Sequence, residues 1–183
     1  MVVIGVLAII GVIMADILKG TIKSNIKTEL TGTIKDNGDK ALNTMDSTIQ
    51  FADRVVCVNT YDASSFNDTI VVVKNGKYTR FRFVKPKAGK NGYLQQEVFT
   101  LSDPTQATTA LCTQNATSPV IITDTDPVSG VSLVVGSFQD NPNPGFKDVV
   151  NISFSLAPAV NIGTGAQNQV GGNVNFATSV ELR

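Results

Sequence analysis

The N-terminal apolar run constrains the fold of this chain more than any other feature. From Val2 to Leu18 only Asp16 is charged, so the run is slightly short of the roughly 20 apolar residues that cross a bilayer as a helix. A secretory signal would carry basic residues before the run and a cleavage site after it, and a buried core helix would keep a polar face. The run therefore predicts a membrane-inserted helix, and its shortness predicts that further residues precede Met1 in the gene.

The apolar side chains of this run are expected to face lipid or the core of an assembly. They are Val2, Val3, Ile4, Val6, Leu7, Ile9, Ile10, Val12, Ile13 and Ile17. Asp16 lies among them, and a carboxylate in such a place needs water, a headgroup or a partner. Two interpretations stay open: Asp16 marks the membrane boundary, or it pairs with a lysine of a neighbouring subunit.

After Leu18 the apolar residues continue as a stripe with helical spacing. Ile22, Ile26, Leu30 and Ile34 recur every four residues, and Leu42, Met45, Ile49, Ala52 and Val56 continue at spacings of three and four. A continuous helix from Val2 to about Val56 would be on the order of 80 Å long, which no domain of this size can enclose. Glycines interrupt the pattern, and we expect the helix to be weakest between Asp16 and Gly20 in an assembled state. The chain thus divides into a helix (residues 1–56) and a head (residues 57–183).

Composition limits the function of the head. The 183 residues hold 15 Lys and Arg against 15 Asp and Glu, so no overall charge recruits nucleic acid or anionic lipid. There is no His, the commonest metal ligand and general base at neutral pH. Cys57 and Cys112 suit one disulfide, which is typical of proteins outside the cytoplasm, and two buried free thiols are the alternative.

From Thr69 onward the period changes to that of β-strands. Residues 70–74 and 77–84 flank Asn75-Gly76, the strongest hairpin signal in the chain, and Phe81 and Phe83 should pack on the helix. A third strand is expected at Tyr93–Leu101, followed by an irregular stretch over 102–118. Later strands are predicted at 120–123, 131–138, 149–157 and 174–182, with turn-rich loops at 139–145 and 158–172.

Three stretches together resemble the type IV pilin and type II secretion pseudopilin family. They are VVIGVLAIIG at the N-terminus, YTRFRFVKPKAGKNGYLQQEVF (residues 78–99) in the middle and FATSVELR (residues 176–183) at the end. The family's processing site would end where Met1 stands, and the proline often found along the pilin helix has no counterpart here. The resemblance implies an α+β fold in which a long N-terminal helix packs on an antiparallel β-sheet domain.

The resemblance also implies a function. The protein would be a structural subunit that waits in the cytoplasmic membrane, is handled by pilus assembly machinery, and then polymerises with itself or other pilins into an extracellular filament. The resemblance of the last strand favours a minor, J-type or W-type subunit. A membrane-anchored adhesin or DNA receptor is a second hypothesis, and a tethered β-domain that never polymerises is a third.

One basic run is the best candidate for binding a polyanion such as DNA, or a host surface. It comprises Lys74, Lys77, Arg80, Arg82, Lys85, Lys87 and Lys90, interleaved with Tyr78, Phe81 and Phe83. The alternative is the solvated face of a hairpin, whose lysines discourage edge pairing.

Other patterns predict little. Asp124, Asp126 and Asp140 could offer oxygen ligands to calcium, but they match no EF-hand and are more typical of turns. Gly163-Thr-Gly165 is expected to be a flexible loop, since Asn168 stands where a dinucleotide loop needs its third glycine. Asn67, Asn115 and Asn151 begin Asn-x-Ser/Thr triplets, which arise often by chance in such a chain. We expect no catalytic site, metal or cofactor.

Overall fold

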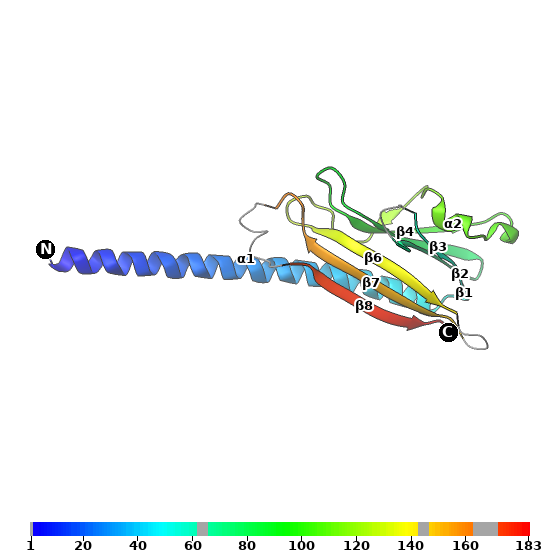
Figure 1. The fold of residues 1–183 in the computed structure, drawn as a ribbon, viewed down its shortest axis with the longest axis horizontal. Coiled ribbons are helices and arrows are strands. Elements are labelled where there is room, and N and C mark those ends of the chain that lie inside the picture. The colour runs from blue at the N-terminus through cyan, green and yellow to red at the C-terminus, as the bar shows by residue number, and fades with distance from the viewer. Residues whose placement is uncertain (1, 62–65, 143–146, 163–171) are drawn as a thin grey trace.

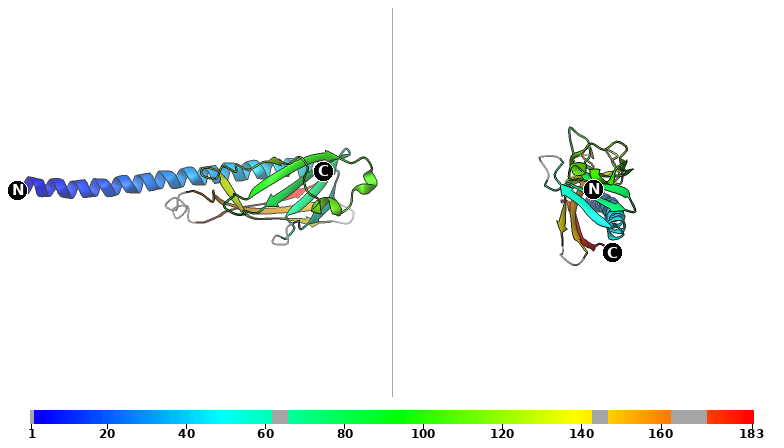
Figure 2. Two further views of the ribbon diagram at one scale, coloured as in Figure 1. Left: turned by 90° about the horizontal axis from the view of Figure 1, so that it is seen from above. Right: turned by 90° about the vertical axis from the view of Figure 1, so that its right-hand side faces the viewer.

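A single long helix dominates the computed structural model, which describes residues 2–61, 66–142, 147–162 and 172–183, with the side chains of 2–10 and 12 left aside. Helix α1 (Val2–Gln50) has 49 residues. Its C-terminal half lies against the head, and its N-terminal half projects beyond it (Figures 1 and 2). The helix is continuous through Asp16–Gly20 in the single chain, and the weakness expected there in an assembled state stays a prediction.

The helix ends earlier than its periodicity predicts. Strand β1 (Arg54–Asn59) takes up Val56, which we had placed on the helix. Two observations explain the change: the backbone N–H of Asp53 already bonds to the carbonyl of Val73 at 2.8 Å, and the next residues are rich in β-branched valine. Tertiary pairing with a neighbouring strand therefore overrides a helical spacing of four.

The first sheet has five antiparallel strands in the order β1-β2-β3-β4-β5. The further strands are β2 (Thr69–Lys74), β3 (Lys77–Val84), β4 (Tyr93–Thr100) and β5 (Val120–Ile121). The hairpin prediction is confirmed: Asn75 and Gly76 both have positive φ, 49° and 73°, as a type I′ turn requires. A short 3-10 turn, η1 (Pro104–Gln106), and one turn of helix, α2 (Ala110–Thr113), lie between β4 and β5.

The second sheet has three antiparallel strands in the order β6-β7-β8. They are β6 (Val131–Asn141), β7 (Val149–Pro158) and β8 (Val174–Glu181). Strand β6 runs three residues past the predicted end at Phe138, because Gln139, Asp140 and Asn141 pair with β7. The start of the loop predicted at 139–145 is therefore strand, and most of the loop at 158–172 lies outside the described residues.

The main core lies between the C-terminal half of α1 and the inner faces of both sheets. Its largest fully buried side chains include Ile34, Met45, Ile49, Phe81, Leu133, Phe138, Ile152 and Leu156. Phe81 and Phe83 both belong to this core, but Phe83 contacts the second sheet: its ring stacks on Phe138 at 4.6 Å between centroids and lies tilted against Phe154 at 5.7 Å. The chain is thus an α+β protein with one long helix and two antiparallel sheets.

Gly38 marks the closest approach of helix and sheet. It is buried, and a Cβ atom built there would overlap the ring of Phe176, which is itself stacked on Phe154 at 5.0 Å between centroids. The glycine that weakens the helix locally therefore has a packing reason.

Candidate functional sites

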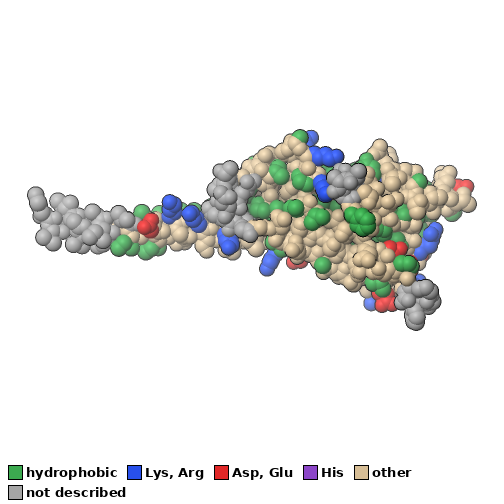
Figure 3. All heavy atoms as spheres, in the orientation of Figure 1, with side chains coloured by type: hydrophobic (Ala, Val, Ile, Leu, Met, Phe, Trp, Pro, Cys, Tyr) green, Lys and Arg blue, Asp and Glu red, His purple; other side chains and the backbone are tan. Residues whose placement is uncertain are grey.

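The projecting part of α1 exposes large apolar side chains to solvent. They are Ile13, Met14, Ile17, Leu18 and Ile22, which are between 50% and 66% exposed (Figure 3). No described residue of the head buries them, since the first buried side chain among those described on the helix is that of Ile34. A contiguous apolar surface of this kind marks a site of interaction with protein or membrane.

Three of the exposed apolar residues lie off the face that the head covers. One stripe of α1 advances in steps of three or four and so stays on one face of the helix: Lys19, Lys23, Lys27, Leu30, Ile34, Gly38, Ala41, Met45 and Ile49. The head buries this stripe from Ile34 onward, and its N-terminal continuation carries lysines. At about 3.6 residues per turn, Met14, Leu18 and Ile22 are rotated by roughly 140–180° from the mean direction of the buried positions, whereas Ile13 and Ile17 are rotated by only about 40° and 80°. The part of the apolar surface formed by Met14, Leu18 and Ile22 therefore faces away from the head.

Asp16 is exposed and lies beside the lysines of that stripe. Within the described residues the structure has one ion pair, between Arg80 and Glu97, so the Asp16 carboxylate forms none. Neither interpretation of Asp16, membrane boundary or partner to a neighbouring subunit, is decided by the single chain.

The basic run of the hairpin does not form one surface. Arg80 and Arg82 are buried, 4% and 2% exposed, and so is Tyr78 between β2 and β4. Lys74 and Lys77 lie at the Asn75-Gly76 turn, whereas Lys85, Lys87 and Lys90 follow the other end of β3, roughly 27 Å away at about 3.4 Å per residue. The prediction of a seven-residue polyanion site is therefore wrong, because the two arginines that would join its halves point into the protein.

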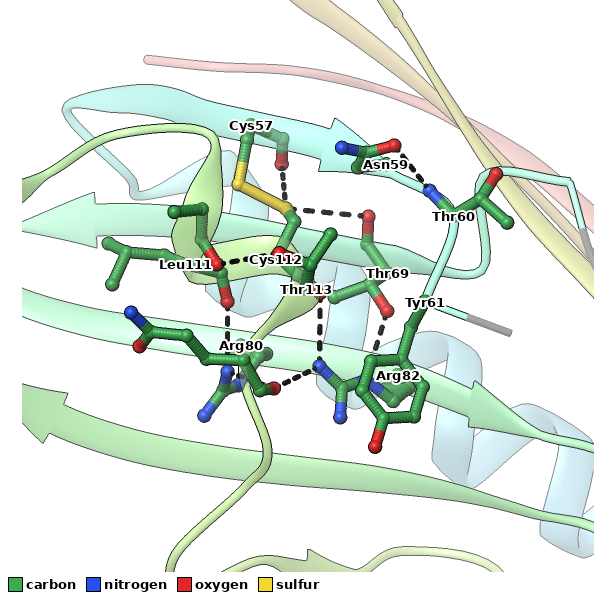
Figure 4. Close-up of a disulfide and its surroundings, with 12 residues drawn as sticks. Cys57, Asn59, Thr60, Tyr61, Thr69, Arg80, Arg82, Leu111, Cys112 and Thr113 are labelled. Atoms are coloured by element: carbon green, nitrogen blue, oxygen red, sulfur yellow. Dashed lines mark hydrogen bonds between the residues drawn. A yellow bond between two sulfur atoms is a disulfide. The ribbon is translucent and has the colours of Figure 1, made fainter. Parts of the chain in front are cut away.

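Arg80 and Arg82 instead hold the segment around α2 against the outer face of the first sheet (Figure 4). Arg80 pairs with Glu97 and donates to the carbonyl oxygens of Leu111 and Gln114 at 2.8 and 2.9 Å. Arg82 donates to Cys112 and Gln114 carbonyls at 3.0 and 2.7 Å, and its guanidinium lies 3.6 Å from the ring centroid of Tyr61. Both cations thus satisfy carbonyls that would otherwise be buried without donors.

The electrostatics of this cluster agree with a structural role. Burial lowers the pKa of Arg82, and the neighbouring positive charge of Arg80 lowers it further. Desolvation raises the pKa of Glu97, but hydrogen bonds from Arg80, Ser118 and Thr117 outweigh it and leave that pKa below its ordinary value. The cluster is therefore charged and closed, with no geometry for binding an outside anion.

The predicted disulfide is confirmed. Cys57 on β1 and Cys112 on α2 are bonded, with Cα atoms 6.3 Å apart. The bond joins the irregular 102–118 stretch to strand β1 and not to the helix, because Cys57 lies beyond the end of α1.

The acidic residues considered for calcium serve the turns and strands around them. Asp126 accepts hydrogen bonds from the backbone N–H groups of Val128 and Ser129 at 2.9 and 2.7 Å, and Asp124 accepts one from Asp126. Asp140 lies in β6 rather than in a loop. The described residues contain no group of three side chains able to hold a metal ion, and Gly163 to Asn168 lie outside them.

A groove lies where α1 ends against the first sheet. It has a volume of about 480 Å³ and is lined by Phe51, Val72, Val98, Ser47, Thr48, Thr79, Asn75, Lys74 and Lys77. The Lys74 ammonium lies 4.9 Å from the ring centroid of Phe51, so one end of the groove is cationic. Sequence reasoning missed this groove, because it joins residues on α1 and β4 that are distant in the chain.

Comparison with known proteins adds no relative, since no family model, curated protein or solved structure matches this chain. In the described part of the chain, no helix combines the length and apolarity needed to cross a membrane.

Proposed function

We propose that this protein is a structural subunit of an extracellular pilus-like filament, in which the N-terminal halves of α1 pack together and the β-rich heads lie outside. The observation that carries the proposal is the exposed apolar surface at Ile13, Met14, Ile17, Leu18 and Ile22, of which Met14, Leu18 and Ile22 face away from the head. Helices that pack through this surface would place their heads on the outside of a bundle without steric conflict. The fold is compatible with the pilin-like arrangement that the sequence suggests.

The energetics favour a partner for this surface. Each of the five side chains leaves half or more of its surface in water, and burying one fully is worth about 1.5–3 kcal/mol. Gly11 lies seven residues before Leu18, on the same side of the helix, and nothing lies within 4 Å of the position of its missing side chain. A small residue there lets a second helix approach closely.

The route to the filament is part of the same proposal. The sequence of the apolar run from Val2 to Leu18, rather than a membrane-spanning helix among the described residues, is what supports residence in the cytoplasmic membrane before assembly, because lipid and a helix bundle both accept side chains without polar atoms. The Cys57–Cys112 disulfide supports a head that lies on the oxidising side of that membrane. Assembly would then require dedicated machinery and copies of this chain or related pilins.

The two competing functions have less support. A DNA receptor or adhesin built on the basic hairpin loses its central arginines to the closed cluster with Glu97. A tethered β-domain that never polymerises would leave the exposed apolar surface of α1 without a protein partner. If the following experiment fails to find filaments that contain this chain, the tethered domain is the function that it supports.

The test compares two variants of α1 that each gain one carboxylate. Ile17→Asp changes the apolar surface, whereas Asn43→Asp changes an exposed polar position of the same helix beside the head. We expect electron microscopy to find filaments on cells with the native chain or Asn43→Asp, and none with Ile17→Asp despite normal levels of the subunit. Filaments that persist in Ile17→Asp, or native cells without any filament containing this chain, would refute the proposal. The abundance of filaments separates a major from a minor subunit.

A further inference from the structure

We propose that Asn115 is an acceptor for an N-linked glycan. The sequence has three Asn-x-Ser/Thr triplets without proline in the middle, Asn67-Asp-Thr69, Asn115-Ala-Thr117 and Asn151-Ile-Ser153. Such a triplet is used only where the asparagine and the hydroxyl residue reach solvent on a surface segment. The fold distinguishes the three on this criterion, although the sequence alone does not.

The triplets at Asn67 and Asn151 are poorly placed. Thr69 is fully buried in β2, where its hydroxyl donates to Asp68 and accepts from Arg82. Asn151 lies in β7, the central strand of its sheet, paired with Gln139 and Ser179, and its side-chain oxygen accepts the Ser179 hydroxyl at 2.6 Å. Modification at either place would disturb a buried hydroxyl or the middle of a sheet.

Asn115 and Thr117 are both exposed and lie in the irregular segment between α2 and β5. The Asn115 side-chain oxygen accepts a hydrogen bond from the Tyr61 hydroxyl, so the carboxamide nitrogen is turned away from Tyr61. The backbone of the segment is fixed independently, by Arg80 on the Asn115 carbonyl at 3.3 Å and by Thr117 N–H on Glu97 at 2.6 Å. A glycan on the nitrogen would therefore leave the contacts of the segment intact.

The position also suits the molecule as a whole. The α2 segment lies at the end of the head far from the projecting half of α1 (Figure 1). A glycan there would extend into solvent and stay clear of the apolar surface of the helix. The proposal requires only that the head be exported, as its disulfide suggests, and it does not require that the chain polymerise.

The reaction is a group transfer whose sugar donor is a lipid-phosphate-linked oligosaccharide. The Asn115 carboxamide nitrogen forms a bond to the anomeric carbon of the sugar. The bond from that carbon to the phosphate oxygen breaks, the lipid phosphate leaves with the electron pair, and one proton of the nitrogen passes to a base of the transferase. The structure assigns only the acceptor residue. The transferase and the sugar donor would be supplied by the cell that makes the protein.

Peptide mass spectrometry of the full chain from its native cells tests the assignment. After reduction and alkylation of the Cys57–Cys112 disulfide, trypsin places the three triplets in separate peptides, residues 55–74, 91–147 and 148–183. We expect an added sugar mass on 91–147 that is lost in Asn115→Gln and in Thr117→Ala, which keeps the asparagine, and retained in Asn151→Gln. Unmodified 91–147 in the native protein, or sugar on the other two peptides only, overturns the proposal. Filament formation by Asn115→Gln is scored separately. Failure of the glycan proposal can then be distinguished from failure of the proposed function.

Discussion

At the scale of single residues, Gly38 has the sharpest steric constraint. Gly38→Ala gains about 1 kcal/mol of helix propensity but forces a methyl group into the Phe176 ring, and overpacking of this kind costs about 1–3 kcal/mol. We expect a net loss of about 1 kcal/mol in the free energy of unfolding, measured by denaturant titration. Gly32→Ala is the matched control, because nothing lies within 4 Å of its Cβ position, and it should stabilise the helix.

Glu97 is the residue on which the buried arginines depend. Glu97→Gln leaves Arg80 without its carboxylate partner and removes one negative charge near Arg82, and breaking a buried pair from one side costs about 3–5 kcal/mol. Because the pKa of Glu97 is lowered in the folded state, its stabilising effect is present above its ordinary pKa of 4.5 and is lost as the pH falls through the lowered value. The free energy of unfolding, measured between pH 7 and pH 2, should lack this pH-dependent contribution in Glu97→Gln. An identical acid profile in both proteins would contradict the argument.

At Asp140 the dependence of stability on pH has the opposite sign to that at Glu97. Its Oδ1 atom is buried without a hydrogen-bond partner among the described residues, and desolvation, together with the nearby charge of Asp148, raises its pKa. A carboxyl with a raised pKa destabilises the fold as the pH rises through its ordinary value of 3.8 towards the raised one, and the penalty is complete above the raised value. Asp140→Asn should therefore increase stability at pH 7 by less than about 1 kcal/mol, since the site is partly exposed. Asp36→Asn, an exposed change on α1, should have no such effect in the same thermal melts.

At the scale of elements, the one-turn helix α2 depends on contacts outside itself. A helix of four residues has no stability of its own, and this one is held by the Cys57–Cys112 bond and by Arg80 and Arg82. Opening the 55-residue loop in a Cys57→Ala/Cys112→Ala variant should cost about 4 kcal/mol on the chain-entropy account. Hydrogen exchange should quicken first over 107–118, before β7. Reductant should change the native protein in the same way and leave the variant unchanged.

At the scale of the whole molecule, the head and the projecting half of α1 are energetically separable. Among the described side chains of the helix the buried ones begin at Ile34, so the described core does not use residue 11 or residues 13–28. We expect deletion of residues 1–28 to give a monomer with an unchanged melting temperature, checked by light scattering and calorimetry. A large loss of stability would mean that the projecting segment folds back on the head, and the proposed arrangement of the filament would then be wrong.

Local patterns predicted most of the elements. The Asn75-Gly76 turn, the alternation along β7 and the three-to-four spacing of Ile34, Met45 and Ile49 each follow from the steric demands of neighbouring residues, which sequence displays directly. The end of α1 was misplaced at Val56 because its pairing with β2 is a long-range contact that outweighs a local period. The burial of Arg80 and Arg82 was missed for the same reason, since Glu97 and the carbonyls after Cys112 are brought to them by other strands.

The amino-acid sequence by itself therefore determined a long helix that is apolar at its start, a β-rich head and the single pair of cysteines. Only the tertiary structure decided which face of the helix is left bare, which basic residues are buried and which asparagine reaches solvent. The physical reason is that periodicity and turn chemistry act between neighbours in the chain, whereas burial depends on which distant segments pack together.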